Sequence, residues 1–265
     1  MANPGLLNQY ENNPQVLYSI KLLQLFLTVG TMIVPAFIFP KALQQQPVVY
    51  LKIKVVPKML FVLLAILLIF VSSPLISWLV EINEQVVLPL NWAALEASMK
   101  AAEVTAGKLT IAFLSGSSTT DLLVNLLVVA LFPAIAEELL FRGVLQQFLV
   151  GCFKQVHFAI ILSAIFFSAF HGQFYGFVPR MILGIALGYL FASSGSIWVS
   201  IIAHFVNNAL GVCIVFFGWD KSAALLSESF HFSTMVTVLS AVFSIGILYF
   251  TWAKRTVLSI KRNGE

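Results

Sequence analysis

Three short polar motifs stand within apolar segments, and their residue types are those that hydrolytic chemistry uses. They are EELLFR at 137–142, FSAFH at 167–171 and HFVNN at 204–208. A carboxylate and an imidazole can accept and return protons, and an imidazole or a carboxamide can donate hydrogen bonds to an oxyanion. Brought together, the motifs would supply the parts that hydrolysis of an amide bond needs.

The first motif combines a pair of opposite charges with one further carboxylate. On a helix, Glu138 and Arg142 are four residues apart and can pair. Glu137 is rotated by about 100° and must face another helix or water. The pattern therefore predicts a carboxylate available for proton transfer, with Glu138 and Arg142 supporting it. A purely structural charge cluster between helices is the alternative.

The two histidine motifs lie in separate apolar segments. His171 closes one such segment, where it could simply be a polar residue at a helix end. His204 and Asn208 are four residues apart and share one helix face, so both can act on one point. A polar pair that holds two helices together in lipid is the alternative there. Taken together, a carboxylate, two imidazoles and a carboxamide predict a shared hydrated pocket.

These motifs must be positioned by membrane helices. The chain is 60% hydrophobic and only 10% charged, whereas soluble domains are about 25% charged. We therefore expect an all-α, polytopic membrane helix bundle whose partners include membrane lipids, and a net charge of +4 does not indicate nucleic-acid binding. Cys152 and Cys213 form neither a disulfide framework nor a metal-site spacing.

Apolar segments of about 20 residues predict seven spans. Their ranges are 22–39, 59–80, 122–150, 158–170, 179–192, 197–217 and 234–252. A break at Pro133 would make eight. It would also bring Glu137 level with His171, because seven spans place Glu137 nearer the inner end of its span and His171 near the outer end. Residues 92–108 predict an amphipathic helix at the membrane surface.

The chain divides by content into three parts. We expect an N-terminal membrane region at 1–120, a core at 121–218 that carries the motifs, and a last span with a basic tail at 219–265. Lysines in the loop 41–58 and basic residues at the C-terminus lie on one side of a seven-span chain. This predicts a cytoplasmic C-terminus, with a bacterial inner membrane as the simplest location.

The three motifs, in this order and on separate spans, resemble the CPBP family. These are the CAAX-prenyl-protease and bacteriocin-processing membrane proteins, also called Abi proteins or type II CAAX endopeptidases. The resemblance covers about 121–218 and implies an intramembrane endopeptidase with a peptide or protein substrate, which in eukaryotic members carries a prenylated cysteine. It also implies that Glu137 and His171 activate water, while His204 and Asn208 hold the oxyanion.

Members of this family are often described as metalloproteases. If zinc were bound, Glu137, His171 and His204 would be its ligands, and two imidazoles with a carboxylate form a plausible zinc set. A glutamate-activated water needs no metal, and Asn208 suits an oxyanion better than a zinc shell. We therefore expect a metal-free enzyme without cofactor.

Two other functions fit the same residues. A non-catalytic membrane protein could use them to bind a partner peptide, as in bacteriocin immunity or protein anchoring. A proton-coupled transporter could use buried Glu and His as a relay, but the sequence shows no internal repeat of the kind that transporters carry.

Overall fold

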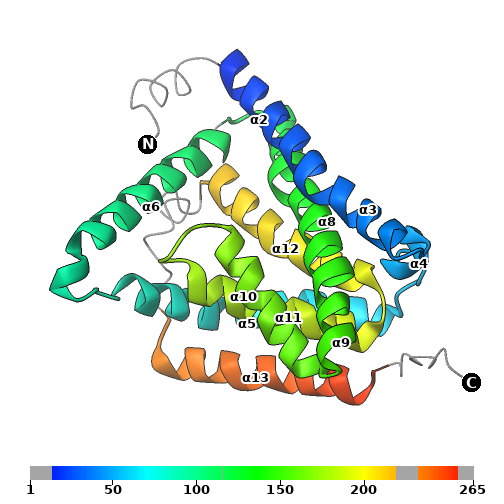
Figure 1. Ribbon diagram of the computed structural model, residues 1–265. Coiled ribbons are helices and arrows are strands. Elements are labelled where there is room, and N and C mark those ends of the chain that lie inside the picture. Colours follow the sequence, from blue (N-terminus) through cyan, green and yellow to red (C-terminus); the bar gives the residue numbers. More distant parts are fainter. Residues whose placement is uncertain (1–13, 115, 219–231, 256–265) are drawn as a thin grey trace, which may run out of the picture.

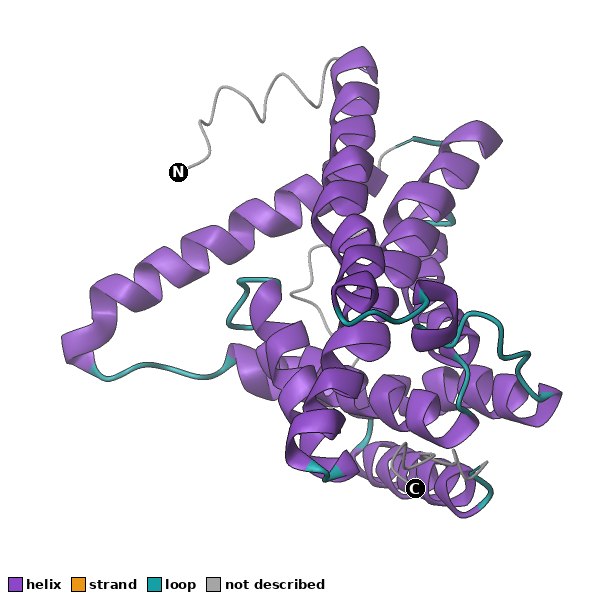
Figure 2. Ribbon diagram, turned by 45° about the vertical axis from the view of Figure 1, so that its right-hand side comes forward, coloured by secondary structure: helices purple, strands orange, loops and turns teal. Residues whose placement is uncertain are grey.

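The computed structural model describes residues 14–114, 116–218 and 232–255, and in these ranges the chain is a bundle of helices without a strand (Figure 1 and Figure 2). The expected all-α membrane bundle is therefore confirmed. In chain order the helices are α2 (Pro14–Thr28), the π-helix η1 (Val29–Ile33), α3 (Val34–Ala42), α4 (Pro47–Tyr50), α5 (Met59–Glu84), the 3-10 helix η2 (Leu90–Trp92), α6 (Ala93–Leu114), α7 (Thr119–Asn125), the π-helix η3 (Leu126–Leu131), α8 (Phe132–Glu138), the π-helix η4 (Leu139–Gln146), α9 (Gln147–Phe153), α10 (Val156–Phe170), α11 (Phe177–Ser194), α12 (Ile197–Phe216) and α13 (Thr234–Ala253).

Six helical segments in the described ranges are long and apolar enough to cross a membrane. They are Gln15–Ala42, Met59–Glu84, Thr119–Phe153, Phe177–Ser194, Ile197–Phe216 and Thr234–Ala253. The remaining expected span is α10, an apolar helix of 15 residues. At about 1.5 Å per residue it is shorter than the hydrocarbon core, so it reaches only part of the way across.

The helix through Pro133 is continuous, so the expected alternative of a break and an eighth span is wrong. The helices from α7 to α9 follow one another directly and form a single segment of 35 residues. Proline cannot donate the usual helical hydrogen bond, and its ring needs space in the preceding turn. The π-helix η3 ends one residue before α8 begins with Phe132 and Pro133, and its wider turn provides that space.

Contacts between distant residues show which helix ends lie together. Near one end, the Tyr18 hydroxyl of α2 donates to Asp121 of α7 at 2.7 Å. At the other end, the rings of Phe39 and Phe148 are 5.7 Å apart, and the Ser196 hydroxyl donates to the carbonyl oxygen of Val55 at 2.6 Å. We call this second end, which contains the loop 43–58 and the turns 154–155 and 195–196, the basic end.

Basic residues gather at that end of the bundle. Trp252 packs on His157 and Tyr189, which places the end of α13 there too. The cations in these connections and helix ends are Lys41, Lys52, Lys54, Lys58, Lys154, Lys254 and Arg255.

Glycines bring α10 and α11 close together. A Cβ atom on Gly184 would lie 3.1 Å from the Cβ of Ala164, and one on Gly188 would lie 2.9 Å from a side-chain carbon of Ile160. The Gly184–Gly188 pair therefore permits close approach of two helix backbones, as small residues do in membranes. Helix α6 extends away from the rest of the bundle (Figure 1 and Figure 2).

Candidate active site

The hairpin of α9 and α10 brings the first two motifs level with each other. Glu137 and His171 each lie 17 residues from Lys154, at the turn of the hairpin, and Oε2 of Glu137 lies 3.9 Å from Nε2 of His171. The expected mismatch in height between these residues is therefore wrong. It arose because a span of 122–150 stops short of the turn, whereas the helix continues to Phe153.

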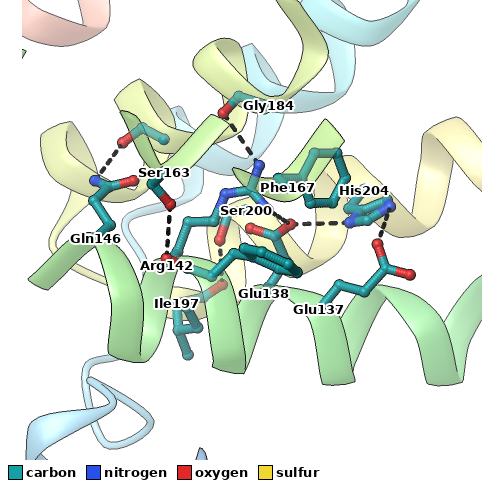
Figure 3. A network of polar contacts seen from close by, with 12 residues as sticks. Glu137, Glu138, Arg142, Gln146, Ser163, Phe167, Gly184, Ile197, Ser200 and His204 are labelled. Atoms are coloured by element: carbon teal, nitrogen blue, oxygen red, sulfur yellow. Dashed lines mark hydrogen bonds and ion pairs between the residues drawn. The ribbon is translucent and has the colours of Figure 1, made fainter. Parts of the chain in front are cut away.

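A buried network joins the first motif to the third (Figure 3). Arg142 Nη1 donates to Glu138 Oε1 at 2.7 Å, and both side chains are at most 1% exposed. The same oxygen lies 2.9 Å from Nδ1 of His204. The predicted Glu138–Arg142 pair is thus present, and Glu138 also orients His204, a link that sequence spacing could not show.

Two more contacts hold this network against α11. Arg142 Nη2 donates to the carbonyl oxygen of Gly184, and Gln146 Nε2 donates to that of Gly188, both at 3.1 Å. The glycines leave the space for this, because a Cβ on Gly188 would lie 2.8 Å from the side-chain oxygen of Gln146. Gly184 and Gly188 therefore allow the side chains of Arg142 and Gln146 to reach α11, in addition to the close approach of the α10 and α11 backbones.

Glu137 faces both predicted histidines. Its Oε2 atom lies 3.9 Å from Nε2 of His171 and 3.8 Å from Nε2 of His204. It has no hydrogen-bond partner within the described ranges, and Figure 3 shows His204 between the two carboxylates. These separations are too long for direct hydrogen bonds and short enough for one water to contact a pair of these groups.

The hydrogen-bond partners of the two imidazoles differ in kind. Nδ1 of His171 lies 2.9 Å from the carbonyl oxygen of Phe167, and a carbonyl oxygen only accepts. Nδ1 of His171 therefore donates, which leaves its Nε2 as an acceptor in the neutral ring. Nδ1 of His204 likewise donates to Glu138, an ion-paired carboxylate.

One cavity contains all four predicted catalytic residues. Its volume is about 510 Å³, and its walls include Glu137, His171, His204 and Asn208. Asn207 Nδ2 donates to the side-chain oxygen of Asn208 at 3.3 Å. The volume of this cavity is in the range of ligand-binding pockets.

Phe167 is the packing centre of the site. Its ring centroid lies 5.1 Å from that of His171 and 5.8 Å from that of His204. The Arg142 guanidinium carbon lies 4.5 Å from the same centroid. One buried ring thus fixes both imidazoles and the supporting cation.

The sequence did not predict several residues of the cavity. Its lining also includes Glu84, Glu103, Tyr175 and Arg180. Glu84 and Glu103 come from the region 1–120, which had no assigned part in the site. Tyr175 and Arg180 follow His171 closely, in the stretch GQFYGFVPR, and its polar and aromatic side chains after a motif histidine were the available signal.

The residues of the cavity do not form an evident metal site. Within the ranges that the structure describes, no group of three or more His, Cys, Asp or Glu side chains is placed to hold a metal ion. We derive no step through a metal, and the metal-free expectation stays a prediction.

The fold and this cavity define a class of protein, the multi-pass integral membrane proteins with acid and imidazole groups gathered inside the bundle. Residues 119–210 match the family model described as Type II CAAX prenyl endopeptidase Rce1-like. This part of the chain is therefore similar to the family that the motifs resemble, a family of CAAX-type intramembrane proteases. No solved structure matches the chain.

A curated relative is similar to part of the chain. The uncharacterized protein YpbD of Bacillus subtilis (strain 168) is 28% identical over 97 residues, which is 35% of this chain. The alignment covers 47% of YpbD, so the chain spans about half the length of this relative.

Proposed function

We propose that the protein is an intramembrane endopeptidase that hydrolyses a peptide bond with a water activated by Glu137 and His171. His204 and Asn208 would stabilise the oxyanion, and Glu138 and Arg142 would hold His204 in place. The observation that carries this proposal is the convergence of Glu137 with both imidazoles in one cavity, at 3.8 and 3.9 Å.

The proposed reaction begins with a water between Glu137 and His171. As the water oxygen bonds to the substrate carbonyl carbon, one of its protons passes to Glu137 or to Nε2 of His171. The carbonyl oxygen becomes an oxyanion. When the carbon–nitrogen bond breaks, the stored proton passes to the leaving nitrogen, which gives a free amine and a carboxylic acid.

The hydrogen bond to Glu138 determines how His204 could act in this step. Because Nδ1 of His204 donates to Glu138, donation to an oxyanion would require a proton on Nε2 as well.

Replacing Glu137 with Gln tests the proposal. We expect turnover of a farnesylated CAAX peptide to fall by about 100-fold or more, because general base catalysis contributes about 10²- to 10⁴-fold. Glu96→Gln, a carboxylate on α6 that does not line the cavity, should retain activity. Both variants should keep the thermal unfolding temperature of the wild type in detergent.

Full turnover by Glu137→Gln would remove the base assignment. If the wild type has no peptidase activity, and a Glu137→Gln/His171→Ala variant keeps the cellular phenotype, the peptide-binding alternative replaces the enzyme.

Chelation tests the metal-free mechanism. We expect the rate of cleavage to be unchanged after incubation with a strong chelator and dialysis. Loss of activity that returns when zinc is added would contradict this expectation and would assign Glu137, His171 and His204 as ligands.

A further inference from the structure

The cavity contains a buried hydroxyl that forms no hydrogen bond with the described residues. Tyr175 is 5% exposed and lines the cavity, and its hydroxyl has no hydrogen-bond partner in the described part of the chain. A buried phenol normally finds a partner. Tyr175 therefore has a donor available to a molecule that enters the cavity.

A guanidinium lies beside the backbone that follows this tyrosine. If Gly176 carried a Cβ atom, it would lie 2.5 to 2.7 Å from the terminal atoms of Arg180. Arg180 also lines the cavity. Both donors therefore line one cavity, and the missing side chain of Gly176 leaves room for the guanidinium.

Arg180 forms no ion pair with any residue of the described ranges. Its side chain donates to the backbone oxygen and the side-chain oxygen of Gln173, at 3.4 and 2.6 Å, and both acceptors are neutral. Across the described residues, no carboxylate oxygen lies within 4.0 Å of it. It also stands in the first turn of α11, where the helix dipole does not favour a cation.

Glu103 and Glu137 in the cavity lining attract this cation electrostatically, but neither forms an ion pair with it. Glu103 accepts hydrogen bonds from Gln173 Nε2, at 3.2 Å, and from the backbone of Tyr175. Burial raises the pKa of Glu103, while Arg180 and the hydrogen bond from Tyr175 act in the opposite direction. Glu137 and Glu84 also line the cavity but make no ion pair with Arg180.

We propose that Arg180 and Tyr175 bind the C-terminal carboxylate of the peptide substrate. A guanidinium can hold a carboxylate through two parallel hydrogen bonds, and the tyrosine hydroxyl would add a third. The inference rests on the proposed function and assigns two specificity-determining residues to it. With the carboxylate held in the cavity that contains Glu137, the protease would cut at a fixed number of residues from a free C-terminus.

The test compares one farnesylated CAAX peptide in two forms, with a free C-terminal carboxylate and with a C-terminal amide. We expect the wild type to cleave the acid more efficiently, by kcat/KM. Arg180→Gln should lower kcat/KM for the acid by about 10- to 100-fold, the range for hydrogen bonds to a charged group. Cleavage of the amide should change by less than about threefold, which is under 1 kcal/mol.

Three further variants separate binding from structure. Tyr175→Phe removes only the hydroxyl and should reduce the preference for the acid. Gly176→Ala keeps all charges but displaces the guanidinium, so it should act in the same direction as Arg180→Gln. Lys108→Gln removes an exposed cation of α6 and should behave as the wild type.

Equal cleavage of acid and amide by the wild type would overturn the subsite. Equal loss on both peptides in Arg180→Gln would do the same, because a structural residue does not distinguish them. If the wild type cleaves neither peptide, the proposed function fails instead. In that case, the unfolding temperature of the protein is measured with the C-terminal tripeptide of the CAAX peptide, as the free acid and as the amide. A larger increase of the unfolding temperature with the acid supports the subsite. Equal changes, or no change with either, overturn it.

Discussion

At the residue scale, Glu138 links the supporting cation to one of the site histidines. One carboxylate oxygen of Glu138 contacts both Arg142 and His204. Glu138 therefore orients the His204 imidazole without lining the cavity itself. The neighbouring Glu137 differs because its Oε2 atom makes no hydrogen bond within the described ranges and lies 3.9 and 3.8 Å from the two imidazoles. Two adjacent glutamates thus serve as a positioning residue and a proposed base.

Removing the cation alone should destabilise the protein strongly. Arg142→Met leaves Glu138 buried with its charge uncompensated, and we expect the free energy of unfolding to fall by about 3–5 kcal/mol. Reversible unfolding in mixed detergent micelles with added SDS measures this change. The double variant Glu138→Gln/Arg142→Met should recover part of the loss, and a double variant no more stable than the single one would contradict the explanation.

The candidate site could be predicted from the sequence only where residues are close along the chain. The pair of Glu138 with Arg142 follows from helical spacing, and so does the shared face of His204 and Asn208. The contact of Glu138 with His204 joins residues 66 positions apart, and local periodicity carries no information on it. Their proposed roles in catalysis stay a prediction.

At the element scale, α10 and α11 depend on two glycines for their close contact. Gly188→Ala adds a Cβ within 2.9 Å of Ile160 and 2.8 Å of Gln146. We expect it to reduce the free energy of unfolding by about 1–3 kcal/mol, as overpacking does. The same SDS titration checks this value.

Gly151 of α9 is the matched control for this substitution. A Cβ there has no neighbour within 4 Å, so Gly151→Ala should have no packing cost and should gain up to about 1 kcal/mol from helix propensity. Equal effects of the two substitutions would show that helix propensity, and not packing, decides the stability at Gly188.

The positions of most helices could be predicted from hydropathy, but their exact ends could not. The segments around Met59–Glu84 and Ile197–Phe216 follow directly from long apolar runs. The continuity through Pro133 depends on a π-helical turn, which composition does not indicate. The cavity lining from α5 and α6 also escaped prediction, because Glu84 and Glu103 occur in a polar stretch that resembles a surface segment.

At the scale of the whole molecule, the distribution of charge gives the bundle a direction. The basic end carries the lysines of the loop 43–58, and the cavity lies toward the other end, beside the loop 172–176. Basic connections remain on the cytoplasmic side of membranes. We therefore expect a cytoplasmic C-terminus and a site that opens toward the opposite face.

Single cysteines test this orientation in intact cells. In a background with Cys152 and Cys213 replaced by Ala, Asn91→Cys places a thiol at the end opposite the basic end. Gln45→Cys places one in the basic loop, and both positions are exposed. A membrane-impermeant maleimide should label position 91 only, and labelling of position 45 alone would reverse the orientation.

The π-helical stretches have a consequence for changes in chain length. Because η4 follows Glu138 with wide turns, deletion of one residue from it can be absorbed by tightening a π turn into an α turn. The side chains before Glu138 and after Gln147 would then still point toward the same neighbouring helices. Helix α10 is a regular α-helix throughout, so it has no π turn that could absorb a deletion. Deleting one residue from it would rotate His171 away from Glu137 by about 100°.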